Sequence, residues 1–433
     1  MFRLFVALIA AFSAPSAARA SANQPLVPSI ALEAPREGQW TVRYRLTKPV
    51  RRLLFVRSPD SSRSETWTVA EGFEIVRAGD SEVLRRRDGA AFNRASARVP
   101  PLYRDLPKDY APFSPFGDGG ILVHSGRFFA CSEPCPDGAR WAMSLAVTDG
   151  RKILVDGRTH EKSAQWEDGD SGRNVYVGSA SPIESPDLVA VIDTALPPKI
   201  RGQLEAQLPL FMGYFSEQLG ELPAKPMLFA SYDVSHRPGY GRQGGTLPGQ
   251  VFTHFYGDVW PSQMDQPSLA HELAWFFAHE AGHLYQRQLY SAEATGAWIH
   301  EGGADAFAAI ALKAVNPALK GPLAELLEAK VKSCTKLLAG GSMHDALAAG
   351  RFDVAYDCGV LLNLSVHKAL LAESPESGGL FAVWRYYIAA SEAGAQPGEE
   401  LFLESIGKAG GLELAEKVKA TVRAPVPPAL ELR

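Results

Sequence analysis

One short stretch restricts the possible folds of this chain more than any other: residues 279–283 read HEAGH, an H-E-x-x-H pattern. The surrounding segment, Ser268 to Leu289, is predicted to form one helix. On a helix, residues four apart project from the same side, so His279 and His283 face one point. Two imidazoles placed in this way can bind one zinc ion, and Glu280 leans towards that ion without binding it. The stretch therefore predicts one half of a metal site.

A second helix is expected to complete that site, because a catalytic zinc ion takes three protein ligands and keeps one position for water. The segment Trp298 to Val315 is predicted to be helical, and Glu301 near its start is the candidate third ligand. Asp305, one turn further on, can accept the free ring N–H of one of the two histidines and so orient it. His300 points about 100° away from Glu301 on an ideal helix and is not expected to bind the ion.

Both segments resemble the motifs of the gluzincin zinc metallopeptidases, namely HEAGH at 279–283 and WIHEGGAD at 298–305. The resemblance is greatest to the aminopeptidase N and glycyl aminopeptidase branches, whose third ligand lies in W-x-x-E-G. The Glu-x-x-x-Asp spacing is also similar to that of thermolysin. Seventeen residues, 284–300, separate His283 from Glu301, one fewer than is usual in the aminopeptidases. A connecting loop can absorb this difference, so Glu301 remains the expected third ligand.

The resemblance also implies roles for residues outside these two helices. The segment 356–359, YDCG, is similar to the Y-x-x-G motif of the family, which implies that Tyr356 hydrogen-bonds the oxyanion. Alternatively, Tyr356 is a tyrosine of the hydrophobic core. The alternative for Asp305 is an acid on the surface with no role in the site. One family feature is missing: the region that matches the G-x-M-E-N strand reads GGTLPGQ, residues 244–250, and holds no acid for the free amine of a substrate.

These residues together predict hydrolysis of an amide bond with one zinc ion as cofactor. Zinc lowers the pKa of a bound water and polarises the substrate carbonyl. Glu280 is expected to act as general base and then to pass the proton to the leaving amine. Tyr356 and the metal are expected to hold the oxyanion. The predicted substrate is a peptide or protein, while a zinc hydrolase of a non-peptide substrate and a non-catalytic peptide-binding protein remain open.

The rest of the chain is expected to divide into several folded parts, because 433 residues exceed one ordinary core. Residues 23–185 contain alternating apolar and polar runs with glycine turns, which predict a β-rich, sandwich-like domain. A thermolysin-like α/β catalytic domain is expected at 186–315. A helical C-terminal region that carries Tyr356 is expected at 316–433. The predicted class is therefore α+β with several domains.

Residues 1–22 are predicted to be a signal peptide. Arg3 precedes an apolar stretch from Leu4 to Phe12, and small residues that fit a cleavage site follow. The apolar stretch is shorter than the ~20 residues that a membrane span needs, and no later segment is predicted to span a membrane. The protein is therefore expected to be exported, to the periplasm or beyond.

The cysteine count and the charge complete the sequence-based picture. Four cysteines in an exported chain predict two disulfides, with three possible pairings. Cys131–Cys135 with Cys334–Cys358 is the simplest, because each pair lies within one predicted domain. The formal net charge of −4 gives no sign of a nucleic-acid partner. The sequence does not indicate the oligomeric state. It also does not distinguish an endopeptidase, which cuts inside a peptide, from an aminopeptidase, which removes N-terminal residues.

Overall fold

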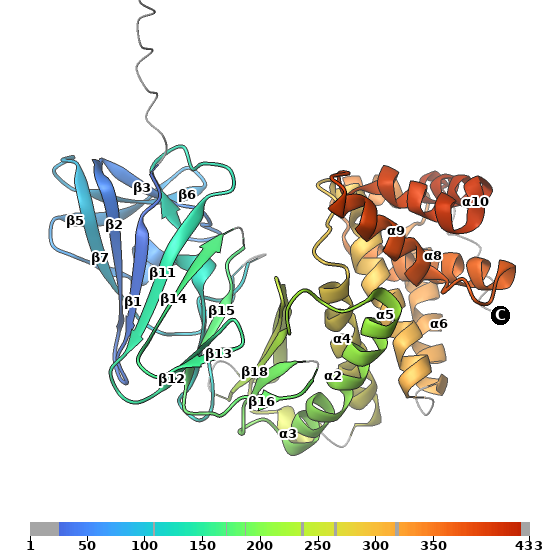
Figure 1. Cartoon of the computed structure of the whole chain (residues 1–433), viewed down its shortest axis with the longest axis horizontal. Helices are drawn as coiled ribbons and strands as arrows, with labels where there is room; N and C mark the ends of the chain where they lie inside the picture. Colours follow the sequence, from blue (N-terminus) through green and yellow to red (C-terminus); the bar gives the residue numbers. More distant parts are fainter. Residues whose placement is uncertain are drawn as a thin grey trace, which may run out of the picture.

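The structure is a computed structural model that describes residues 26–425, except 107–108, 170, 187, 235–237, 264–265 and 317–319. The predicted signal peptide, residues 1–22, lies outside the described residues. Figure 1 shows a β-rich N-terminal region, a central sheet and a helical C-terminal region in a row. The predicted α+β, multidomain class is confirmed. None of the helices in the described ranges is long and apolar enough to cross a membrane.

The described part of the N-terminal region forms three sheets around one apolar core. In β2, the alternate residues Trp40, Val42, Tyr44 and Leu46 are buried, as expected of a strand with one face on a core. The first sheet contains, in spatial order, β14 (Ser163–Gly169), β11 (Arg140–Val147), β1 (Ser29–Ala34), β2 (Trp40–Val50), β7 (Phe92–Val99) and β4 (Thr68–Val69). The second contains β10 (Ala130–Cys131), β3 (Arg52–Phe55), β6 (Ser81–Arg86) and β5 (Phe73–Ala78). The third contains β13 (Arg158–His160), β12 (Lys152–Val155), β15 (Asn174–Gly178), β9 (Ile121–His124) and β8 (Phe113–Pro115).

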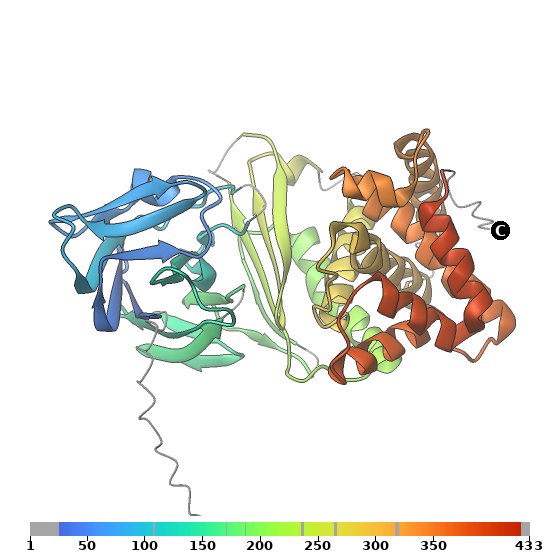
Figure 2. The ribbon, with the colours of Figure 1, turned by 90° about the horizontal axis from the view of Figure 1, so that it is seen from above.

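The central sheet separates two apolar cores. Leu228 and Ala230 face the helical core, whereas their neighbours Met227 and Phe229 pack against side chains of the N-terminal region. Figure 2 shows this sheet standing between the N-terminal strands and the helices. Its spatial order is β16 (Ile183–Glu184), β17 (Val189–Ile192), β18 (Met227–Asp233), β20 (Gln250–Tyr256) and β19 (Gly241–Leu247). β19 lies at one edge and runs antiparallel to β20.

Long helices cover the other face of the central sheet. The first of them is α2 (Pro198–Leu219), and its apolar residues at helical spacing are buried. The helices that follow are α4 (Pro267–Tyr285), α5 (Ala297–Val315), α6 (Lys320–Leu337), α7 (Met343–Ala348), α8 (Asp353–Glu373), α9 (Leu380–Glu392) and α10 (Glu399–Arg423). The short helical turns are α1 (Ser62–Thr66), η1 (Ser125–Phe128), α3 (Trp260–Gln263) and η2 (Ala294–Gly296).

Helices α5 and α8 cross at two glycines, and this crossing determines which side chains meet. A Cβ atom added to Gly302 would lie 2.5 Å from the carbonyl carbon of Gly359, so neither helix tolerates a side chain at this point. Gly302 follows Glu301 directly, and Gly359 lies one turn after Tyr356. The close approach therefore brings the start of α8 to the acidic end of α5.

Both disulfides have the pairing that the sequence favoured. Cys131 bonds Cys135 in a short loop after β10, and Cys334 of α6 bonds Cys358 of α8. The second bond fixes α6 beside the part of α8 that carries Tyr356.

Candidate metal centre

Helix α4 carries both histidines of the HEAGH stretch, but it ends at Tyr285 and not at the predicted Leu289. The prediction of its end was wrong because Arg287 and Gln288 take left-handed backbone angles, with φ of 53° and 56°, which a helix cannot continue through. Gln286 stands at this end and is buried. Its Oε1 atom lies 2.8 Å from His283 Nδ1, while its Nε2 donates to the carbonyl of His300 at 2.9 Å. The end of the helix thus orients a candidate ligand.

The three candidate ligands, His279, His283 and Glu301, converge on one point. The Nε2 atoms of the two histidines lie 3.0 Å apart. Glu301 Oε2 lies 3.5 Å from the first of these atoms and 3.3 Å from the second. Ligands placed tetrahedrally about 2.0–2.1 Å from a zinc ion are roughly 3.3 Å from one another. The donor set and its spacing therefore fit a zinc ion.

The electrostatics of these groups match a cation site. Burial opposes ionisation of Glu301, but His283 and His279 hold its pKa well below its usual range. Burial likewise opposes protonation of His279, but the Asp305 and Glu301 carboxylates raise its pKa to about 10. A metal ion that binds here replaces this proton, as metal binding to histidine generally requires.

Asp305 lies behind His279 and not behind His283. Its Oδ1 atom accepts from His279 Nδ1 at 2.8 Å and from Trp275 Nε1 at 2.9 Å. This contact leaves His279 Nε2 for the ion, which is the arrangement that orients histidine ligands in zinc sites. His283 has Gln286 in the corresponding position. The sequence analysis had not identified Gln286, because glutamine three residues after a histidine is a common and uninformative pair.

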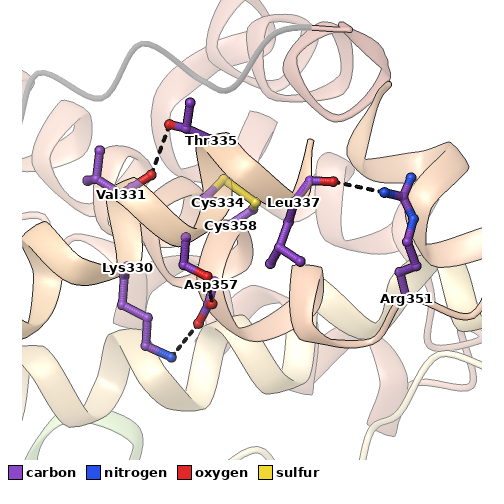
Figure 3. The surroundings of a disulfide bond; sticks show 9 residues. Lys330, Val331, Cys334, Thr335, Leu337, Arg351, Asp357 and Cys358 are labelled. Carbon is purple, nitrogen blue, oxygen red and sulfur yellow. Dashed lines mark hydrogen bonds and ion pairs between the residues drawn. A yellow bond between two sulfur atoms is a disulfide. The ribbon is translucent and has the colours of Figure 1, made fainter. Parts of the chain in front are cut away.

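A lysine of α6 connects Asp305 to α8. Lys330 Nζ lies 3.3 Å from Asp305 Oδ2 and 2.7 Å from Asp357 Oδ1. Asp357 also accepts a hydrogen bond from Ser333 Oγ at 2.5 Å. Figure 3 shows the ion pair between Lys330 and Asp357 beside the disulfide that joins α6 and α8. Since Asp357 follows Tyr356 directly, Lys330 connects the acid that contacts His279 to the segment of α8 that carries Tyr356.

Glu280 points into a cleft of about 590 Å³ that also exposes the three candidate ligands. Its Oε2 atom accepts a hydrogen bond of 2.8 Å from the Thr246 hydroxyl of β19. One side of the cleft is therefore formed by α4 and another by β19, the edge strand of the central sheet. Gly244, Gly245 and Leu247 of that edge also line it, and none of these positions carries an acid.

Tyr356 also lines the cleft, with 36% of its surface exposed, so it is not a tyrosine of the core. Its ring stacks on His279 with centroids 6.1 Å apart. Burial, and next the charge of Glu301, raise the pKa of Tyr356 above its usual value. The hydroxyl therefore keeps its proton and can donate it in a hydrogen bond. His300 lies apart from the three converging ligands, as expected, and its ring contacts Tyr290.

The opposite wall of the cleft contains residues that the sequence analysis missed. Arg57, Asp109, Tyr110 and Ser171 all come from the N-terminal region. The Tyr110 hydroxyl donates to the carbonyl of Thr246 at 3.3 Å, which joins this region to β19. No local motif marks these residues, because they come from separate loops that only the tertiary fold assembles.

The fold is that of the M1 zinc metallopeptidases, which confirms the gluzincin resemblance. An M1 zinc metallopeptidase of Deinococcus radiodurans, solved as a mutant with a Tyr-Ser-Ala substrate, is 13% identical. It has a TM-score of 0.56, and the alignment covers 94% of this chain and 96% of that one. An aminopeptidase N family protein of Idiomarina loihiensis has a TM-score of 0.70 at 10% identity, over 93% of this chain and 77% of that one.

Yeast LTA4 hydrolase has the same fold, with a TM-score of 0.53 and 12% identity over 93% of this chain and 69% of that one. As a sequence, the chain matches no protein-family model and no curated protein. The similarity is therefore one of fold, over almost the whole described chain.

Proposed function

We propose that this protein is an exported zinc metallopeptidase that hydrolyses peptide bonds. The observation that carries the proposal is the convergence of His279, His283 and Glu301 at the wall of a cleft that also contains Glu280. The Nδ1 atoms of both histidines already have partners, so their Nε2 atoms are left to bind a metal ion. The fold similarity to M1 zinc metallopeptidases supports the same function.

Each candidate residue has one task in this proposal. A bound zinc ion would polarise the carbonyl of the scissile bond and lower the pKa of water. Glu280 accepts the proton of the attacking water and passes it to the leaving nitrogen. Thr246 holds the Glu280 carboxylate through its hydroxyl, and the Tyr356 hydroxyl donates to the oxyanion that develops. Asp305 fixes His279.

Export is the second part of the proposal. The protein has two disulfides. Disulfides form in oxidising compartments and are rare in the cytosol. The predicted signal peptide at residues 1–22 supports the same location.

A peptide-library digest by zinc-loaded protein, read by mass spectrometry, tests the function. We expect cleavage by the native protein and a loss of at least roughly 10²-fold in turnover in Glu280→Gln, because general-base catalysis contributes about 10²–10⁴-fold. This substitution keeps the size of the side chain and its contact with Thr246, so zinc content should be unchanged. No cleavage by a zinc-loaded native protein would favour a non-peptide substrate or a binding role. Undiminished cleavage by Glu280→Gln would refute the assignment of the base.

A further inference from the structure

We propose that the cleft selects peptides that carry a carboxylate close to the scissile bond, and that Arg57 binds this carboxylate. The inference rests on the proposed peptidase function and names the class of substrate. The carboxylate can belong to an acidic side chain or to the C-terminus of a short peptide, since both present the same group.

Arg57 belongs to a cluster in which two arginines share one acid. Its Nη1 atom lies 3.0 Å from Asp109 Oδ1, and its Nη2 donates to Ser171 Oγ at 3.3 Å. The other oxygen of Asp109 accepts from the buried Arg127 at 2.5 Å. Two guanidinium groups thus share the carboxylate of Asp109.

Arg57 is the arginine of this cluster that faces the cleft. Arg127 is buried and the Asp109 side chain is only 7% exposed, whereas the Arg57 side chain is 34% exposed and lines the cleft. Arg63 and Arg104, which lie nearby, have their own carboxylate partners: Arg63 pairs with Glu82, and Arg104 pairs with Asp60 and Glu65. Arg57 has donors left for a planar carboxylate, which a guanidinium group binds in a fork geometry.

The described residues of the cleft offer no acid for a substrate ammonium group. Glu301 faces the two histidines and Glu280 is placed as the base. Asp109, the remaining described acid that lines the cleft, is held by two arginines. The edge strand β19 adds none. The cleft is therefore suited to an anionic or neutral group and unsuited to a free amine.

The position of Arg57 follows from a chain of contacts that starts at the base. Glu280 contacts Thr246, and Thr246 contacts Tyr110. Tyr110 follows Asp109, which holds Arg57. Burial, and next the Glu280 charge, raise the pKa of Tyr110 to about 12, while Arg57 opposes this increase, so the phenol is neutral. A peptide that pairs with β19 thus passes from Glu280 towards Arg57.

Matched peptides test this selection. One set carries Asp or Glu near the cut and an amidated C-terminus, a second has a free C-terminal carboxylate and no acidic side chain, and a third carries Asn or Gln with an amidated C-terminus. We expect kcat/KM for at least one carboxylate set to exceed that of the third set roughly ten-fold or more, as charge-assisted hydrogen bonds allow. The first two sets distinguish a side-chain from a C-terminal carboxylate.

Two variants of Arg57 and one control identify the group responsible. Arg57→Gln should abolish the preference, and Arg57→Lys should keep part of it, because lysine keeps the charge but not the fork. Arg158→Gln, which removes an exposed arginine of β13 outside the cleft, should keep all of it. An equal rate for all three sets, or a preference that survives in Arg57→Gln, overturns the inference.

A binding measurement separates this inference from the proposed function. Calorimetry with the Glu280→Gln variant compares the affinity of a carboxylate peptide with that of its amide counterpart, without hydrolysis. If the native protein cleaves no peptide, the peptidase proposal fails, whereas tighter binding of the carboxylate peptide that depends on Arg57 still supports the subsite. Equal affinities for both peptides overturn the subsite whether or not cleavage occurs.

Discussion

The two walls of the cleft are built on different principles. The helical wall, from α4, α5 and α8, holds its two histidines by contacts with its own residues: Asp305 fixes His279, and Gln286 fixes His283. The strand wall consists of β19 and loops of the N-terminal region, and the side chain of Thr246 connects it to Glu280. Under the proposed function, the first wall would carry out the reaction, while the second would select the peptide.

Tyr356→Phe should give the largest effect among the tests of this comparison. The substitution removes only the hydroxyl, so the stacking on His279 and the zinc content should remain. We expect turnover to fall roughly 10²–10³-fold, the loss found when one oxyanion donor is removed. Single-turnover kinetics with measured zinc content checks this. An unchanged rate would show that the Tyr356 hydroxyl does not stabilise the oxyanion.

Asp305→Asn tests how far the helical wall depends on its supporting contacts. The amide keeps the shape but loses the charge that His279, Trp275 and Lys330 face. Loss of such a partner weakens metal binding about 10–100-fold. Titration with a competing chelator measures the affinity for zinc. An affinity equal to that of the native protein would return Asp305 to the role of a structural acid.

Gly302→Ala tests whether the crossing of α5 and α8 positions the site. Its added methyl group would overlap the backbone of Gly359, so the helices must separate. We expect a loss of roughly 1–3 kcal/mol in the free energy of unfolding, the usual cost of overpacking, together with lower turnover. The matched control is Gly213→Ala in α2, where an added Cβ meets nothing within 4 Å. The control should be neutral or slightly stabilising, and equal behaviour of the two variants would contradict the argument.

Thr246→Val should give the smallest effect, because it removes one hydrogen bond to Glu280 and keeps the shape. A hydrogen bond to a charged group contributes about 1.5 kcal/mol at the lower end of its range, which corresponds to roughly ten-fold in rate. We expect a decrease of this size in kcat/KM without loss of zinc, measured by steady-state kinetics. A loss as large as that of Tyr356→Phe would show that the strand wall takes a direct part in the reaction.

The same difference explains what the sequence could predict. His279, Glu280, His283, Glu301 and Asp305 lie on two helices, and helical periodicity places residues of one helix relative to one another without knowledge of the fold. Tyr356 was found through its Y-x-x-G resemblance, and the crossing of Gly302 with Gly359 gives that motif its physical reason.

Other contacts could not be predicted, because they join segments far apart in the chain. Lys330 meets Asp305 only when α6 packs against α5, and a lysine in an amphipathic helix gives no signal of such a role. Arg57 and Asp109 reach the cleft from loops of two different sheets. The end of α4 was also placed wrongly, because the left-handed turn after Gln286 uses residues that ordinarily continue a helix.

The crossing of α5 and α8 at Gly302 and Gly359 also determines when, during synthesis of the chain, the candidate centre becomes complete. A nascent chain that ends before Asp353 already holds the HEAGH stretch and Glu301, but it has neither Tyr356 nor a partner for Cys334. The glycine face of α5 is then uncovered, and the candidate centre lacks one of its walls. Because domains fold as their sequence emerges, the centre is completed only once α8 has been synthesised. Under the proposed function, a partly made chain would lack the Tyr356 hydroxyl and would cleave the proteins around it poorly.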